Sequence, residues 1–150
     1  RGEVFVFDTR NIYKLAQYTA IGPHYIKRLV GIPGDTISIS PPNLVVNGHP
    51  AGENTIQRVE QGNPPYNKEG YVFAAGSLNY LYRPPMMNGE DKLHLKYDPM
   101  NPGMNEYAAL GDNTTSSLDS RYWGSVKQYN VIGPALFNFW PFTEHWGYIP

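Results

Sequence analysis

Residues 111–124, GDNTTSSLDSRYWG, form the most distinctive stretch of this 150-residue sequence. Glycine, aspartate and asparagine at its start favour a tight turn, because the polar side chains bond nearby backbone and glycine tolerates positive φ. Further on, Asp119 and Arg121 directly precede a Tyr-Trp-Gly sequence. Such charges lie inside a protein only when they neutralise one another, since an unpaired buried charge is costly. The stretch therefore predicts either a plain structural turn or an inward-folded functional loop held by an ion pair.

A second motif, YIKRLVGIPGD at residues 25–35, has the pattern of a strand that ends in a turn. Side chains alternate between the two faces of a strand, so Lys27 and Arg28 are expected to point in opposite directions. Their neighbours on both faces are mostly apolar. One of the two charges is therefore expected to lie against apolar side chains. The opening sequence RGEVFVF at residues 1–7 is typical of a further strand.

Length and composition limit the class of protein. A chain of 150 residues fits one domain, and its 12 Tyr, 14 Pro and 15 Gly favour short strands and turns over long helices. The net charge of −1 gives no argument for nucleic acid as a partner. The chain has no Cys and its four His are far apart, so neither a thiol nucleophile nor a metal site is expected. It begins inside a strand without Met, as a trimmed or processed fragment would.

The expected elements add up to an all-β, mostly antiparallel fold with little helix. Strands are predicted at residues 3–7, 24–31, 36–40, 44–47, 71–75, 79–83, 92–97, 106–110 and 131–139. Residues 9–20 carry a weak helical spacing. Residues 49–70 are polar and rich in Pro and Gly, which predicts a loop with at most one short strand.

These motifs together resemble the type I (leader) signal peptidases of bacteria, a family of Ser/Lys proteases. The resemblance rests on the Arg-Gly-acid strand, on Lys-Arg-φ-Val-Gly-φ-Pro-Gly-Asp, and on Gly-Asp-Asn followed by Asp-Ser-Arg. It implies one extracytoplasmic catalytic domain over residues 1–150, with a signal-peptidase-like β fold and no metal or organic cofactor. Residues 1–48 and 106–150 are expected to form its core, and the loosely matching residues 49–105 an insertion or cap.

Lys27 and Ser117 are the candidate catalytic residues. Taken alone, Lys27 is a strand lysine whose charged end reaches solvent, and Ser117 is a turn hydroxyl. The resemblance implies that Lys27 is the general base and that Ser117 orients its amine. A base must be unprotonated near neutral pH, and burial lowers a lysine pKa from its usual value of about 10.4. A rival interpretation makes Ser117 itself the nucleophile, with Lys27 as its base.

The resemblance also assigns two ion pairs. Arg28 is expected to bind Asp112, which joins the lysine strand to the central loop. Asp119 is expected to bind Arg121, which fixes the shape of that loop. Without the family, these pairs would be ordinary exposed ones worth less than ~1 kcal/mol.

The substrate is expected to bind as an added β-strand, bonded through its main chain. By resemblance, His24, Tyr25 and Ile26 match the segment that pairs with the peptide, although each also suits a core position. Small neighbouring pockets would select the Ala-x-Ala pattern of signal-peptide cleavage sites. An aromatic cluster at residues 136–142 and Trp146 fits either core packing or an apolar rim that touches the bilayer surface.

The chain departs from the family in one respect. The family nucleophile belongs to a Ser-Met-x-Pro motif that precedes the Arg-Gly-acid strand, and this motif is absent here. All seven Ser of the chain follow Lys27. In the family, the oxyanion-hole donors and membrane anchors come from the same missing segment. The chain alone is therefore expected to be inactive, and a longer gene product or a retained N-terminal piece is expected to complete the site.

The sequence thus predicts a Ser/Lys endopeptidase that removes signal peptides from exported preproteins. Its expected partners are signal peptides and the membrane surface, on the extracytoplasmic side of the inner membrane. One alternative is a non-catalytic binding module that retains the fold. Another is a secreted glycan-binding β-sandwich, which predicts exposed aromatics and no buried lysine. A repressor-type self-cleaving Ser/Lys protease is the last, and the central loop favours the leader-peptidase branch over it.

Overall fold

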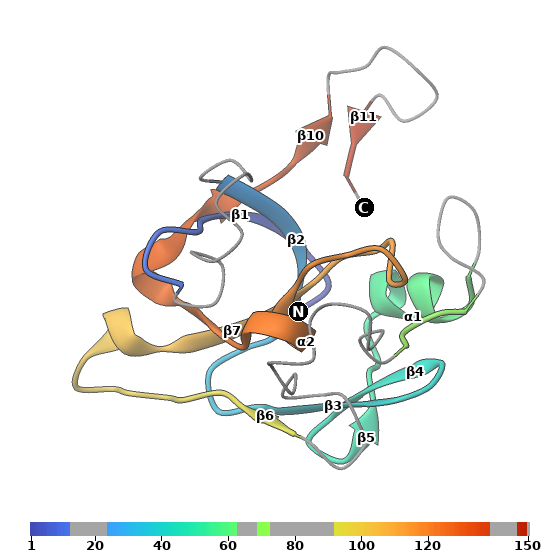
Figure 1. Ribbon diagram of the computed structural model, residues 1–150, viewed down its shortest axis with the longest axis horizontal. Helices are drawn as coiled ribbons and strands as arrows, with labels where there is room; N and C mark the ends of the chain where they lie inside the picture. The colour runs from blue at the N-terminus through green and yellow to red at the C-terminus, as the bar shows by residue number, and fades with distance from the viewer. Residues whose placement is uncertain (13–23, 63–68, 73–91, 139–146, 150) are drawn as a thin grey trace.

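The computed structural model describes residues 1–12, 24–62, 69–72, 92–138 and 147–149 of the chain. Within these residues strands predominate, and every strand pairing is antiparallel. The strands form a five-stranded, a four-stranded and a two-stranded sheet (Figure 1). The predicted all-β, mostly antiparallel fold is confirmed.

The five-stranded sheet has the order β8-β7-β2-β1-β9, so the strand that carries Lys27 lies at its centre. Its members are β1 (Val4–Asp8), β2 (His24–Gly31), β7 (Glu106–Leu110), β8 (Val126–Lys127) and β9 (Val131–Pro134). Both β2 and β7 have the predicted bounds. β1 pairs with β2 from His24 to Arg28, whereas β7 pairs with it only from Arg28 onward. Among the described residues, His24 to Ile26 therefore have a strand partner on one side only.

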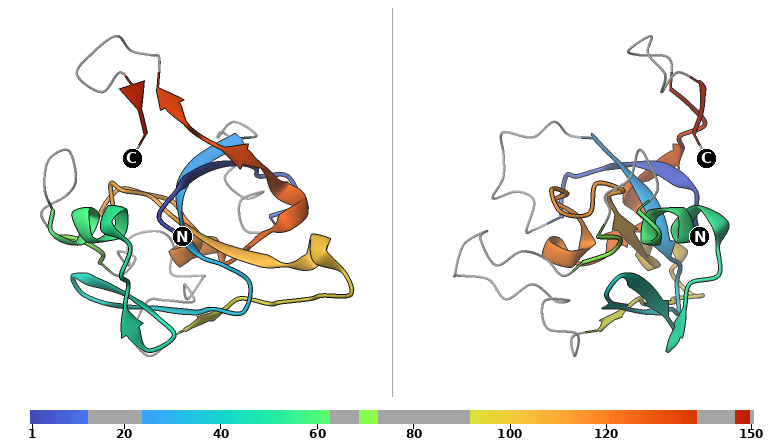
Figure 2. Two further views of the ribbon diagram at one scale, coloured as in Figure 1. Left: turned by 180° about the vertical axis from the view of Figure 1, so that it is seen from behind. Right: turned by 90° about the vertical axis from the view of Figure 1, so that its right-hand side faces the viewer.

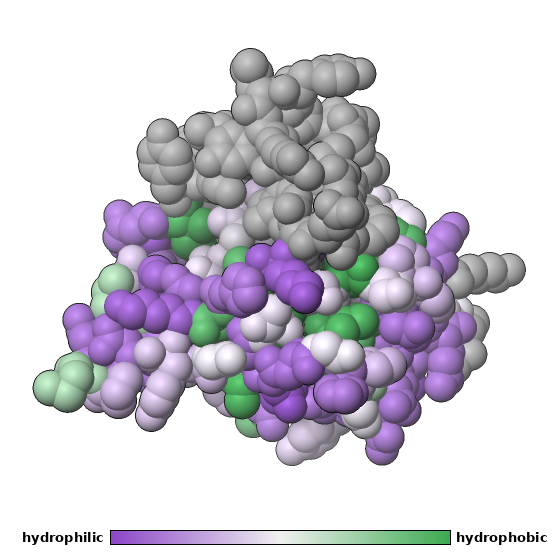
Figure 3. Space-filling view, turned by 90° about the horizontal axis from the view of Figure 1, so that it is seen from below, coloured by the Kyte–Doolittle hydropathy of each residue, from purple (hydrophilic) through white to green (hydrophobic). Residues whose placement is uncertain are grey.

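The four-stranded sheet, of order β5-β4-β3-β6, forms a second layer. It consists of β3 (Thr36–Ser40), β4 (Asn43–Val46), β5 (His49–Pro50) and β6 (Leu93–His94). Asn47 and Gly48 turn the chain from β4 to β5 with φ of 53° and 84°, as the Asn-Gly sequence predicted. Seen from the side of this sheet, hydrophilic side chains cover most of the described surface, with small separate hydrophobic areas between them (Figure 3).

Two apolar cores flank the five-stranded sheet, because successive strand residues point to opposite faces. On one face, Phe7 and Tyr25 pack with Trp123 from the central loop. On the other face, Val30 and Leu110 pack into a core shared with the four-stranded sheet. Full burial of one large apolar side chain contributes roughly 1.5–3 kcal/mol. The strands on either side of Lys27 are therefore held from both faces.

The prediction of a loop for residues 49–70 is wrong over one part, because the structure contains the helix α1 (Asn54–Glu60) there. Its apolar side is limited to Ile56 and Val59, both fully buried, which is too few residues to give a helical period in the sequence. Contacts with the rest of the fold hold the helix instead. The Thr55 hydroxyl donates to the Gly2 carbonyl at 2.9 Å, and a Glu60 carboxylate oxygen accepts from the Leu44 amide at 2.9 Å.

Two predicted strands are shorter than expected. The strand predicted at residues 131–139 is interrupted: β9 ends at Pro134, and β10 (Phe137–Asn138) pairs with β11 (Gly147–Tyr148) instead. The β10–β11 hairpin projects away from the two larger sheets (Figures 1 and 2). The strand predicted at residues 92–97 is limited to β6, because the Leu95 backbone bonds to the turn at Gly34 and Asp35.

Three short helical turns complete the described part of the chain. The central loop ends in α2 (Ser120–Trp123), and two 3-10 turns, η2 (Pro102–Met104) and η3 (Gln128–Asn130), precede β7 and β9. No helix among the described residues has the length and apolar character needed to cross a bilayer. The predictions for residues 9–20, 71–75 and 79–83 and for the aromatic cluster lie wholly or largely outside the described residues.

Candidate active site

The site is built around the amine of Lys27, near the middle of β2. Lys27 Nζ lies 3.0 Å from Ser117 Oγ, which comes from the central loop 90 residues further along the chain. Ser117 is buried, and the Tyr25 ring centroid lies 5.4 Å from the amine. These two residues and a cavity of about 410 Å³ surround the nitrogen. The structure thus brings together the two residues that the sequence singled out, with space beside them for a reactant.

Burial lowers the pKa of the Lys27 amine below its usual value, because desolvation disfavours the charged form. The nearby Asp119 and Asp112 carboxylates raise this pKa and the Arg121 cation lowers it, but burial has the largest effect. Each of those carboxylates already binds an arginine. Burial therefore shifts the amine towards its unprotonated form, which is the form that accepts a proton.

The wild-type chain is expected to gain stability relative to Lys27→Met as the pH rises from neutral towards about 10.4, the ordinary lysine pKa. The folded chain releases the Lys27 proton at a lower pH than the unfolded chain does, since burial lowers the pKa. Between the two pKa values the unfolded chain binds more protons, so the free energy of unfolding rises with pH. Urea unfolding across this range measures the difference. Lys92→Met, at an exposed lysine, is the matched control, and a Lys27→Met difference that stays constant with pH contradicts the lowered pKa.

Gly111 allows the loop to close over the amine. A Cβ at this position would overlap the hydroxyl and Cβ of Ser117 and would lie 3.3 Å from Lys27 Nζ. Only glycine permits this approach without a shift of the loop. The first glycine of the central loop is therefore part of the geometry that keeps Ser117 against Lys27.

Arg28 forms the predicted ion pair with Asp112. Its Nε and Nη2 atoms donate to the two carboxylate oxygens at 2.8 and 2.7 Å, while Nη1 donates to the Gly2 carbonyl at 2.6 Å. The guanidinium is buried and its planar fork suits a bidentate contact. Arg28 therefore ties the strand that bears Lys27 to the central loop on one side and to the start of β1 on the other.

Asp119 and Arg121 form the second predicted pair, and both side chains are completely buried. Two parallel bonds of 2.8 Å join Arg121 Nε and Nη2 to the Asp119 carboxylate. The same carboxylate accepts from the Gly111 amide at 2.9 Å, at the opposite end of the loop. The pair thus clamps the loop shut and holds Ser117 within it.

Five further residues hold the loop in place, and the sequence did not assign them a role. The Ala109 amide donates to Ser120 Oγ at 2.8 Å, which fastens the loop to β7. Thr114 Oγ1 donates to the Gly70 carbonyl at 2.5 Å, and Arg121 Nη1 donates to the Val72 carbonyl at 2.8 Å. Thr114 and Ser120 lie within the motif at residues 111–124, so the motif was the sequence signal that could have indicated their role. Gly70, the partner of Thr114, and Val72, a partner of Arg121, lie in the loosely matching region, where no signal was present.

The predicted substrate-binding residues lie on β2 directly before Lys27. His24 is exposed, Tyr25 is buried, and Ile26 is 59% exposed and lines the Lys27 cavity. On the β7 side of these residues, the described part of the chain has no strand partner. The arrangement leaves a sheet edge that leads to the amine and that could accept an extended peptide.

Comparison with known proteins gives consistent matches. The family model described as signal peptidase, peptidase S26, matches residues 1–140. A signal peptidase I of Leptolyngbya laminosa is 29% identical over 141 residues, and a probable signal peptidase I-2 of Synechocystis is 30% identical over 141 residues. Both alignments cover 94% of this chain, but only 53% and 48% of those relatives. The chain thus spans about half the length of the curated relatives it matches.

A solved structure matches as well. The crystal structure of a signal peptidase I from Enterococcus faecalis is 25% identical to this chain and superimposes with a TM-score of 0.53. The superposition covers 90% of this chain and 94% of that one. The likeness therefore extends over both larger sheets and is not confined to the two motifs.

Proposed function

Because this chain belongs to the peptidase S26 family of signal peptidases, we propose that it forms the catalytic domain of a type I signal peptidase. The enzyme hydrolyses exported preproteins after Ala-x-Ala sites, on the extracytoplasmic side of the inner membrane. Residues 1–150 form a single domain, with its core in residues 1–48 and 106–150. The nucleophilic serine comes from a segment that precedes Arg1. "The longer protein" below means this chain together with that segment.

Lys27 acts as the general base. Its unprotonated amine removes the proton from the nucleophilic serine hydroxyl as the oxygen attacks the scissile carbonyl. The protonated amine then gives that proton to the leaving nitrogen, and an acyl-enzyme ester remains. Lys27 next takes a proton from water, which attacks the ester and releases the signal peptide, and the amine then returns this proton to the serine oxygen. Ser117 keeps the nitrogen lone pair directed at the nucleophile through its hydrogen bond.

One observation supports this proposal above the others: a lysine amine with a lowered pKa lies 3.0 Å from a buried serine hydroxyl, beside an open cavity. A surface lysine would be protonated and hydrated, and it would serve no purpose as a base. The same burial argues against the glycan-binding alternative, which predicted no buried lysine.

The residues of the substrate before the cleaved bond add to β2. His24 to Ile26 offer main-chain groups on a side where, among the described residues, no strand pairs with them. A peptide bonded there runs along the sheet edge and arrives at the Lys27 amine with its small residue next to the exposed Ile26. Main-chain bonding explains how many different signal peptides bind one site, because it does not depend on most side chains.

The membrane surface is the second proposed partner. Tyr148 is 81% exposed and belongs to the β10–β11 hairpin, which projects from the rest of the fold (Figures 1 and 2). Aromatic side chains of this kind are favourable at a bilayer interface. Contact there keeps the site near substrates that are still tethered to the membrane.

A cleavage assay tests the proposal with a peptide that carries an Ala-x-Ala junction. The longer protein is expected to cut the peptide after the second alanine, and residues 1–150 alone are expected to leave it intact. Cleavage by residues 1–150 would mean that the nucleophile lies within the chain, with Ser117 as the first candidate. Binding without cleavage by the longer protein would favour the binding-module alternative.

A further inference from the structure

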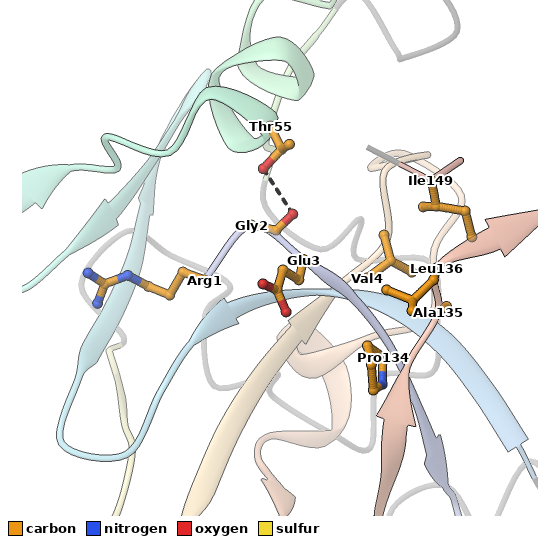
Figure 4. A pocket seen from close by; sticks show the side chains of 9 residues that line it. All are labelled: Arg1, Gly2, Glu3, Val4, Thr55, Pro134, Ala135, Leu136 and Ile149. Atoms are coloured by element: carbon orange, nitrogen blue, oxygen red, sulfur yellow. Dashed lines mark hydrogen bonds between the residues drawn. The ribbon is translucent and has the colours of Figure 1, made fainter. Parts of the chain in front are cut away.

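A second cavity, of about 300 Å³, adjoins the cavity at Lys27. The two cavities share Val4 and Ile149 as lining residues, so they meet along one wall. Figure 4 shows the residues that line the second cavity, which come from the start of β1, the first turn of α1, the end of β9 and the end of β11. The catalytic roles proposed above involve none of the residues that line this second cavity alone.

The walls of the second cavity are fixed by backbone contacts. The Ala135 amide donates to the Val4 carbonyl at 2.8 Å, and the Ile149 amide donates to the Leu136 carbonyl at 3.2 Å. On the opposite side, the Thr55 hydroxyl holds the Gly2 carbonyl at 2.9 Å (Figure 4). These bonds join four separate parts of the chain around one hollow, so the cavity has a defined shape.

The cavity lies on the far side of Lys27 from the proposed strand-addition edge. In the β1–β2 pairing, Val6 faces Ile26 and Val4 faces Arg28. Val6 is therefore level with Ile26, which is proposed to bind the part of the substrate before the cleaved bond. Val4 is level with Arg28, the residue after Lys27. An extended peptide that passes His24 to Ile26 and reaches the amine is then level with Val4, which lies across β2 from that edge and lines the second cavity.

The lining is apolar on one side and acidic on the other. Val4, Pro134, Leu136 and Ile149 supply the apolar wall, and Glu3 borders the cavity with its carboxylate on the side turned away from Val4, Leu136 and Ile149 (Figure 4). Arg1 points away from the apolar group (Figure 4) and is bound to Asp35 and Glu53, at 2.7 Å each. Among the described residues no cation pairs with Glu3, so its negative charge remains available to a ligand.

We propose that this second cavity binds the substrate residues that follow the cleaved bond, and that Glu3 makes it favour a basic over an acidic side chain there. The inference rests on the proposed function, because it takes Lys27 as the point of cleavage. It makes Glu3 a specificity-determining residue for the part of the substrate that becomes the mature protein. The apolar wall holds the aliphatic part of a lysine or arginine while the charged end reaches the carboxylate.

A peptide series tests the charge preference in the longer protein. All peptides carry one Ala-x-Ala junction, and Lys, Gln or Glu occupies the first, second or third position after the bond. At one of these positions kcat/KM is expected to be about three- to tenfold higher for Lys than for Glu, as for a partly screened charge pair. Glu3→Gln is expected to bring that ratio close to one and Glu3→Lys to reverse it. Glu69→Gln, at an exposed acid outside the cavity, is the matched control and should keep the wild-type ratio.

If the peptides are cleaved normally but Glu3→Gln leaves the Lys-to-Glu ratio of kcat/KM unchanged, the inference is overturned. The proposed function then remains intact.

A second measurement does not need catalysis. A peptide with a photo-crosslinking side chain at the second position after the junction is bound to the Lys27→Ala variant of the longer protein, which leaves it uncut. Labelling of Leu136 or Ile149 supports the inference. Labelling confined to residues 113–117, or no labelling of the second cavity, shows another exit or another occupant and refutes it.

Discussion

Lys27→Ala is expected to lower kcat/KM of the longer protein for an Ala-x-Ala peptide by about 10²–10⁴-fold, the usual contribution of a general base. In the proposed mechanism, Lys27 supplies the nitrogen that accepts the proton of the nucleophilic serine. Lys27→Arg should be equally damaging, because a guanidinium stays protonated at any pH the protein tolerates. Steady-state cleavage of a fluorogenic peptide measures both variants.

The control for this prediction is Lys92→Ala, which removes an exposed lysine from the edge of the four-stranded sheet. It should retain wild-type cleavage. If Lys27→Ala also cleaves normally, the base is another group and the assignment built on the Ser117 contact is wrong. Circular dichroism of each variant shows whether a loss of activity reflects chemistry or a loss of the fold.

The largest effect on stability is expected from Asp119→Ala. This change leaves the Arg121 guanidinium without its carboxylate in a completely buried position, and it removes the acceptor of the Gly111 amide. Breaking a buried ion pair on one side costs about 3–5 kcal/mol, because the remaining charge is neither solvated nor paired. Urea unfolding of residues 1–150 measures the loss.

Two comparisons separate the buried charge from a general effect of the substitution. Asp98→Ala removes a carboxylate that binds Lys96 at the surface, and it should change the unfolding free energy little. The double variant Asp119→Ala with Arg121→Ala should be less destabilised than the sum of the two single variants, since no lone charge remains. If Asp119→Ala costs no more than Asp98→Ala, the loop does not depend on this pair.

Strands that cross the centre of the fold could be predicted from the sequence, and peripheral elements could not. β2 and β7 are flanked by recognisable turns and have apolar residues on both faces, so pattern and motif agreed on their bounds. α1 was missed because its two buried residues give no period and its stability comes from partners distant in sequence, such as Gly2 and Leu44. Tertiary contacts of this kind leave no local signal.

The site was predictable to a similar degree. The family resemblance implied that Ser117 meets Lys27, and it assigned the two ion pairs as well. The contacts that Gly70 and Val72 of the loosely matching region make with the central loop were not predictable. Gly70 has a φ of +61°, and a Cβ there would lie 2.6 Å from the Glu60 carbonyl oxygen, so only glycine fits this position. A glycine in a Pro- and Gly-rich stretch is unremarkable until its neighbours are known.

The contacts of Arg28 with Gly2 and Asp112 bear on how the two halves of the proposed catalytic centre stay aligned. The Arg28 guanidinium donates a hydrogen bond to the Gly2 carbonyl, where any preceding segment joins β1. It also donates to the Asp112 carboxylate. In the proposed enzyme, Arg28 therefore holds the point where the serine-bearing segment enters β1 and the loop beside Lys27 in one fixed arrangement.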